Sequence, residues 1–168
     1  MKNKRYLSAL SIFLLWSSLE SAYAVEIEPT GKALLAILGT PKVVKKSLKA
    51  SGKPVELYIA KDAAGKSTSV AFIQKGVYEP NCTHTWAVGI NPSDGKVSQV
   101  RVIEMSCAHA FPTRATSFLD QYKGKGIADV ATLDSSVSTI AKATGSSKLA
   151  TDAVKRSITA FNQIKGQI

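Results

Sequence analysis

A short hydroxyl-rich turn, Ala143-Thr-Gly-Ser-Ser147, stands near the C-terminal end of this 168-residue chain. It directly precedes apolar residues spaced as on one face of a helix: Leu149, Ala153, Val154, Ile158 and Phe161. The first N–H groups of a helix have no intrahelical partner, and the helix dipole favours an anion beside them. Such a turn can therefore bind a phosphate group. The alternative is that Ser146 or Ser147 only caps the helix.

Two Cys-x-His pairs, Cys82-Thr-His84 and Cys107-Ala-His109, contain every cysteine and histidine of the chain. Two cysteines in an oxidising compartment predict a disulfide between Cys82 and Cys107. Two thiolates and two imidazoles would also suit zinc or copper, and strand alternation places the Cys and the His of each pair on one face. A metal site formed by Cys82, His84, Cys107 and His109 is therefore the alternative.

A hairpin is predicted between the two pairs, because Asp94-Gly95 separates strand-like runs at 85–90 and 97–105. A turn centred on Asp94-Gly95 sets Cys82 opposite Cys107. The same register sets Val88 opposite Arg101, whereas the alternation of apolar residues in the two runs predicts an apolar residue opposite Val88. One β-bulge between the turn and the cysteines would satisfy both requirements.

The N-terminus is typical of a secretory signal. It has a basic start (Lys2, Lys4, Arg5), an apolar run at 6–16 and the small-x-small sequence Ala22-Tyr-Ala24. We expect a signal peptide at 1–24, cleavage following Ala24, and a periplasmic or secreted protein. An uncleaved anchor is the alternative. The remaining residues, 25–168, have the length of a single domain.

The chain is basic, with a formal net charge of +10. A basic surface suits phosphate-bearing ligands, acidic partner proteins or anionic envelope surfaces, and secretion argues against nucleic acid. Five lysines without an acidic residue crowd the segment 42–53. We interpret them as the solvated face of a helix, with Val44 and Leu48 on its inner side.

The remaining pattern predicts an α+β fold. A short helix is expected at 30–38, and a second one from Thr40-Pro41 to Gly52 because proline suits the first helical position. Strands are expected at 55–59, 69–74, 85–90 and 97–105, and a long helix at 147–164. The architecture is then an antiparallel sheet, or meander, with N-terminal helices and a C-terminal helix whose N-terminus forms the phosphate seat.

Three blocks follow one another in a fixed order: 88–104, which holds the hairpin, Phe118-Leu-Asp-Gln-Tyr-Lys-Gly-Lys125, and 143–147 opening a helix. In this order the chain resembles the FMN-binding domain family over residues 55–161. That family includes the periplasmic flavin-carrying subunits of sodium-pumping NADH:quinone reductases and of Rnf-type electron-transport complexes. The resemblance implies a secreted FMN-binding electron carrier that serves a membrane-associated envelope redox partner, rather than a stand-alone enzyme.

The family pattern at the helix start reads Ser-Gly-Ala-Thr-x-Thr-Ser, and a flavin transferase joins the FMN phosphate to its second Thr. On this chain Ala143 and Thr144 match the Ala-Thr pair, Ser146 falls on the acceptor, and Ser147 matches the last Ser. Lys142 replaces the Gly. Members of the family often carry FMN covalently, but Lys142 and Ser146 depart from the pattern, so we expect FMN to bind non-covalently, with a bond through Ser146 as the alternative. A degenerate member without flavin is the third alternative. The implied cofactor-binding residues are Lys142, Ala143, Thr144, Gly145, Ser146 and Ser147.

Four aromatic residues could pack a flavin ring, although each is also typical of a core: Tyr78, Trp86, Phe111 and Tyr122. A hypothesis of a different class remains beside the flavin one. In that hypothesis the chain is a non-flavin periplasmic binding module, stabilised by the Cys82–Cys107 disulfide or by the Cys/His metal site.

Overall fold

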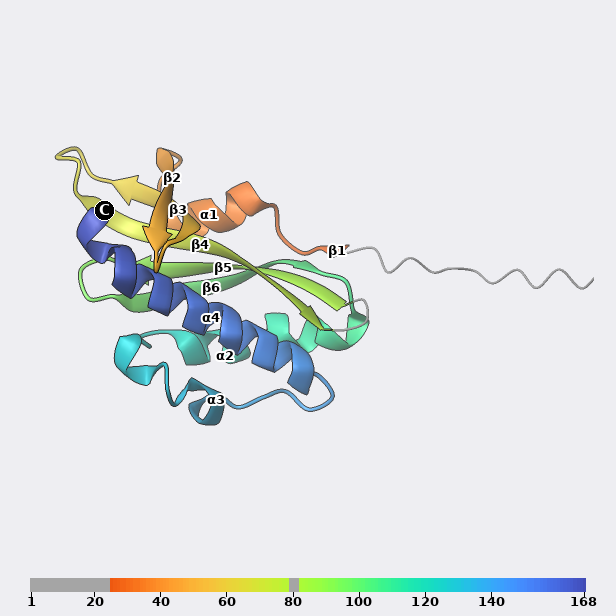
Figure 1. Cartoon of the computed structure of the whole chain (residues 1–168). Coiled ribbons are helices and arrows are strands. Elements are labelled where there is room, and N and C mark those ends of the chain that lie inside the picture. Colours follow the sequence, from red (N-terminus) through yellow and green to blue (C-terminus); the bar gives the residue numbers. More distant parts are fainter. Residues whose placement is uncertain (1–24, 79–81) are drawn as a thin grey trace, which may run out of the picture.

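The computed structural model describes residues 25–78 and 82–168, so the predicted signal peptide lies outside the described residues. The chain forms one six-stranded antiparallel sheet in the order β1-β6-β5-β4-β3-β2 (Figure 1). The strands are β1 (Val25–Glu26), β2 (Val43–Ala50), β3 (Lys53–Lys61), β4 (Ser67–Tyr78), β5 (Cys82–Asn91) and β6 (Lys96–Met105). Each strand from β2 to β5 pairs with the next one along the chain, which confirms the predicted meander.

Two helices cover opposite faces of this sheet. The long helix α4 (Thr144–Ile164) crosses one face, and α1 (Thr30–Leu38) packs on the other (Figure 1). Shorter turns connect β6 to α4: η1 (Ala108–Arg114), α2 (Thr116–Leu119), η2 (Asp120–Tyr122), η3 (Ile127–Asp129) and α3 (Leu133–Ser136). A last turn, η4 (Lys165–Gln167), follows α4. Within residues 25–78 and 82–168, no helix combines the length and the apolar character that crossing a bilayer requires.

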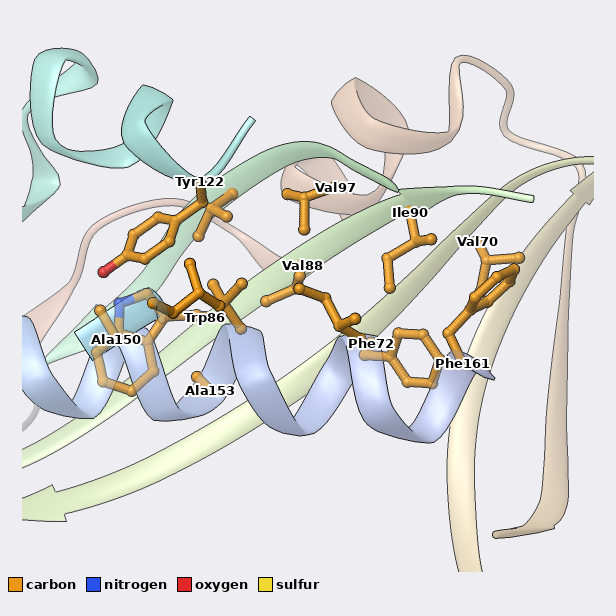
Figure 2. Close-up of a cluster of buried hydrophobic side chains, with 14 of the residues drawn as sticks. Val70, Phe72, Trp86, Val88, Ile90, Val97, Tyr122, Ala150, Ala153 and Phe161 are labelled. Carbon is orange, nitrogen blue, oxygen red and sulfur yellow. The ribbon is translucent and has the colours of Figure 1, made fainter. Parts of the chain in front are cut away.

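The main core lies between the sheet and α4. Trp86, Val88 and Ile90 of β5 face the helix there, and Phe161 and Ala153 reach them from α4 (Figure 2). All five are buried. Burial of a large apolar side chain stabilises the fold by about 1.5–3 kcal/mol, so this layer holds α4 firmly against the strands that carry the predicted hairpin.

The predicted second helix, from Thr40-Pro41 to Gly52, is wrong, because this segment forms strand β2. Ser51 and Gly52 both have positive φ, 46° and 79°, which is the backbone of a two-residue hairpin turn into β3. Val44, expected to point inward, is 44% exposed. The lysine spacing fitted a solvated helix face, but lysines are equally typical of an outer edge strand, where they discourage pairing with another chain.

The hairpin between β5 and β6 contains two register shifts rather than the one predicted bulge. They fall between Gly89 and Ile90 and between Thr85 and Trp86. The middle of the hairpin pairs Val88 with Val100, as the apolar pattern required. The turn is closed by Asn91 pairing with Lys96, so it is not centred on Asp94-Gly95. The hydrophobic pattern, rather than the turn sequence, sets the register.

Candidate functional site

The first turn of α4 carries N–H groups that nothing in the described part of the chain caps. Ala143 is the N-cap residue, and it makes no side-chain cap hydrogen bond. The first helical hydrogen bond runs from the Ser147 N–H to the Ala143 carbonyl, at 2.9 Å. The N–H groups of Thr144, Gly145 and Ser146 therefore have no acceptor among the described residues, and the positive end of the helix dipole adds to them. This arrangement favours an anion.

Ser147 has a structural role in this turn. Its hydroxyl is buried, donates to the Ala143 carbonyl at 2.9 Å and accepts from the Ile140 N–H at 3.1 Å. The two bonds fasten the loop before α4 to the first turn of the helix. Ser147 thus shapes the turn, and its hydroxyl is engaged within the protein.

Ser146 points into the protein. Its hydroxyl lies 3.0 Å from Nε2 of His84, and both side chains are buried. Burial lowers the pKa of His84, and the Thr83 backbone partly opposes this shift, so the imidazole is neutral at neutral pH. The ring also meets Trp86 edge-on, with 5.4 Å between the centroids. Nδ1 of His84 has no hydrogen-bond partner within residues 25–78 and 82–168.

Lys142 stands just before the helix in a conformation that favours glycine. Its φ is +64°, in the left-handed region that side chains with a Cβ rarely adopt. The Lys142 side chain is exposed and adds a positive charge beside the three free N–H groups.

Tyr78 is the aromatic residue that lies at this turn. A Cβ on Gly145 would come within 2.6–2.9 Å of three carbons of the Tyr78 ring, so only glycine fits beneath the ring without displacing it. Tyr78 is 54% exposed, whereas Trp86 and Tyr122 are fully buried in the core. Of the four aromatic residues considered for a flavin ring, Tyr78 thus combines an exposed ring with a position against the first turn of α4. The sequence carried no signal of this contact, because Tyr78 and Gly145 are far apart in the chain.

The expected disulfide between Cys82 and Cys107 is present, with 5.4 Å between the two Cα atoms. It joins the start of β5 to the residue that precedes η1, close to His84. Because each sulfur is bonded to the other, neither is a thiolate. His84 meets Ser146, and His109 is exposed. In the part of the chain that the structure describes, no three His, Cys, Asp or Glu side chains gather as metal ligands would.

A cleft of about 370 Å³ flanks α4 immediately after this turn. It is lined by Asp134, Val137, Thr139, Lys148, Thr151 and Asp152. The Thr151 hydroxyl at its floor meets the hydroxyl of Tyr122 at 3.0 Å. Burial raises the pKa of Tyr122 to about 12, so this phenol stays protonated. The two carboxylates make the cleft a poorer place for phosphate than the α4 start itself.

Comparison with known proteins gives one likeness of fold. No protein-family model and no curated protein matches the chain. Among solved structures, the fold is similar to that of NqrC from Shewanella oneidensis, with a TM-score of 0.51 and 15% sequence identity. The match covers 79% of this chain and 71% of that one. At such low identity the likeness establishes the fold alone.

Proposed function

We propose that this chain is an extracytoplasmic FMN-binding protein that carries electrons to or from an envelope redox partner. The observation that carries the proposal is the uncapped start of α4, where three free N–H groups stand beside Lys142. The fold likeness to NqrC supports it, since the sequence resembles a family that includes flavin-carrying subunits of sodium-pumping NADH:quinone reductases. The disulfide is compatible with an extracytoplasmic location.

The residues at the α4 start fit the phosphate end of FMN. The N–H groups of Thr144, Gly145 and Ser146 would donate to the phosphate, and the Lys142 ammonium would lie beside it. When bound, a flavin supplies one- and two-electron redox chemistry. The protein's part is to hold the phosphate, to keep Gly145 free of a side chain beneath Tyr78, and to exclude water from the buried His84 side of the turn.

The burial of Ser146 favours non-covalent binding. A hydroxyl that accepts a phosphodiester bond must face its donor, but the Ser146 hydroxyl faces His84 and its residue is only 8% exposed. Covalent attachment would require this side chain to leave the His84 nitrogen and turn outward. We therefore place the FMN phosphate against the backbone and Lys142, without a bond to Ser146.

Production of the protein together with a flavin transferase and free FMN tests the proposal. The purified protein should be yellow, with absorbance in the flavin bands. Intact mass should show no adduct. If an adduct forms, Ser146→Ala should abolish it, and an adduct that survives this change would refute the assignment of the acceptor. Colourless protein would overturn the flavin function and favour the non-flavin binding module.

A fluorescence titration with FMN measures the contribution of Lys142. Lys142→Gln should weaken binding by roughly tenfold, because it removes one charge-assisted contact. Lys123→Gln is the matched control, since Lys123 is exposed and lies on the loop after η2. Equal affinity of the two variants would mean that the phosphate does not sit at the α4 start.

A further inference from the structure

The free edge of the sheet next to β2 carries a concentrated positive charge. Because β2 is the last strand in the sheet order, no described strand pairs with its outer side. Five lysines lie on β2 and its flanks: Lys42, Lys45, Lys46, Lys49 and Lys53. We call these five residues the lysine edge. Lys45 forms an ion pair with Glu56 at 2.9 Å, and Glu56 raises the pKa of Lys45. The other four have no acidic partner among the described residues.

The lysine side chains project from both faces of the sheet. Lys46 pairs across from the core residue Leu57, whereas Lys45 pairs across from Tyr58 on the α1 side. Their long stems can extend beyond the edge, so the ammonium groups form a strip along β2. A lysine ammonium group is a single charge on a flexible stem, and unlike an arginine guanidinium it does not bind one carboxylate or phosphate through two parallel hydrogen bonds. A strip of lysines therefore suits a diffuse layer of anionic groups better than one bidentate ligand.

Apolar side chains are exposed beside this strip. Val44 is 44% exposed and Leu35, on α1, is 47% exposed. A mostly apolar cleft of about 380 Å³ lies between α1 and β2, with Pro41 and Tyr58 among its lining residues. Val44 lies on the α4 side of the sheet and Leu35 on the α1 side, so exposed aliphatic side chains border the lysines on both faces. Lysines combined with exposed aliphatic side chains suit the headgroup region of a bilayer.

We propose that the lysine edge docks on a bilayer surface rich in anionic phospholipids. Charge complementarity argues for this occupant, since four lysines without an acidic partner gather on β2 and its immediate flanks. An acidic protein that adds a strand to β2 is a weaker candidate, because lysines on an edge strand oppose further pairing. This docking does not depend on flavin binding, although it would hold an electron carrier close to a membrane partner.

Co-sedimentation with lipid vesicles tests the proposal. The purified protein is mixed with vesicles of phosphatidylcholine, with or without phosphatidylglycerol, in low and high salt. We expect binding to the vesicles that contain phosphatidylglycerol, with little binding to pure phosphatidylcholine and a strong decrease in high salt. Equal binding to both vesicle types would overturn the proposal. So would binding to polyglutamate without binding to anionic vesicles, which would point to an acidic protein.

Two charge-matched variants locate the contact. The edge variant changes Lys42, Lys46, Lys49 and Lys53 to Gln. The control variant changes four exposed lysines elsewhere to Gln: Lys66, Lys75, Lys123 and Lys165. The partition coefficient on anionic vesicles should fall at least about tenfold for the edge variant and much less for the control. All three proteins share residues 1–24, so any binding by that segment is common to them. An equal decrease in both variants would show that net charge alone drives binding, and would refute docking through the lysine edge. Circular dichroism should show that both variants are folded.

Discussion

His84 should make the stability of this protein depend on pH just below neutrality. The imidazole is 1% exposed, and its burial lowers its pKa from the ordinary value of 6.5. The unfolded chain therefore binds a proton at a higher pH than the folded protein does. The free energy of unfolding should fall as the pH drops below about 6.5, and should keep falling until the pH reaches the folded pKa.

The size of this effect follows from proton linkage. While only the unfolded state binds the proton, the free energy of unfolding changes by about 1.4 kcal/mol per pH unit. That full slope holds only well below pH 6.5, where the unfolded histidine is completely protonated. Between pH 7.5 and pH 5.5 the unfolded histidine is on average half protonated, so the loss over these two units is about 1.4 kcal/mol if the folded His84 stays neutral throughout. This is a measurable part of the stability of a domain of this size.

Urea unfolding at a series of pH values measures the effect, with the fluorescence of Trp86 as the probe. Trp86 is fully buried and touches the His84 ring, so unfolding should change its emission. His84→Gln keeps a polar partner for Ser146 but removes the titrating group. This variant should be less stable at pH 7.5, by about 1–3 kcal/mol, and should lose less stability between pH 7.5 and 5.5.

His109→Gln provides the control, because His109 is the other histidine of the chain and is exposed. It should keep the pH-dependence of the unchanged protein. Carboxylates titrate in all three proteins, so the comparison isolates His84. If His84→Gln loses as much stability as the unchanged protein over this range, the buried neutral His84–Ser146 pair is refuted.

Two further predictions concern positions where the structure favours glycine: one that a glycine occupies and one that a lysine occupies. Gly89→Ala should lower the free energy of unfolding by about 1–3 kcal/mol, because its Cβ would lie 2.5 Å from Cγ2 of Ile37 on α1. Thermal unfolding measures the loss. Gly31→Ala is the control and should raise stability slightly, because its Cβ would meet nothing within 4 Å and Gly31 lies in helix α1. Lys142→Gly should raise the free energy of unfolding by about 0.5–1 kcal/mol because it relieves the positive φ, whereas Lys148→Gly within α4 should lower it by about 1 kcal/mol. Changes of the same sign would contradict the left-handed backbone at Lys142.

The long helix and the central strands could be predicted from the sequence because their signals were strong and local. The apolar residues of α4 repeat at helical spacing, and Ala153, Val154, Ile158 and Phe161 are all buried as expected. The pattern of β5 and β6 likewise indicated that Val88 faces an apolar neighbour, which is Val100. Such periodicity reports burial directly, so tertiary packing agrees with it.

The segment 42–53 shows where local patterns fail. Its lysines and its Thr40-Pro41 start fitted a helix, but the structure pairs Val43 with Ala60 and Lys46 with Leu57 across a tight turn at Ser51-Gly52. An edge strand has a partner on only one side, so its burial pattern is weak and its exposed residues resemble those of a solvated helix. The decisive information was the two-residue turn, whose positive φ values favour a hairpin.

The sequence predicted a helix from residue 147, and α4 begins three residues earlier, at Thr144, but the direction of the hydroxyl groups in its first turn could not be predicted. A serine just inside a helix can cap it, bind a ligand or face inward, and only the packing of α4 on β5 decides between these. That packing brings Ser146 to His84 and Ser147 to the Ile140 N–H, so both serines serve the fold. The groups left to meet an anion are the N–H groups of the first turn and the Lys142 side chain. The proposed FMN binding uses these groups and not the serine hydroxyls, so Ser146→Ala should disturb it far less than a change at Lys142.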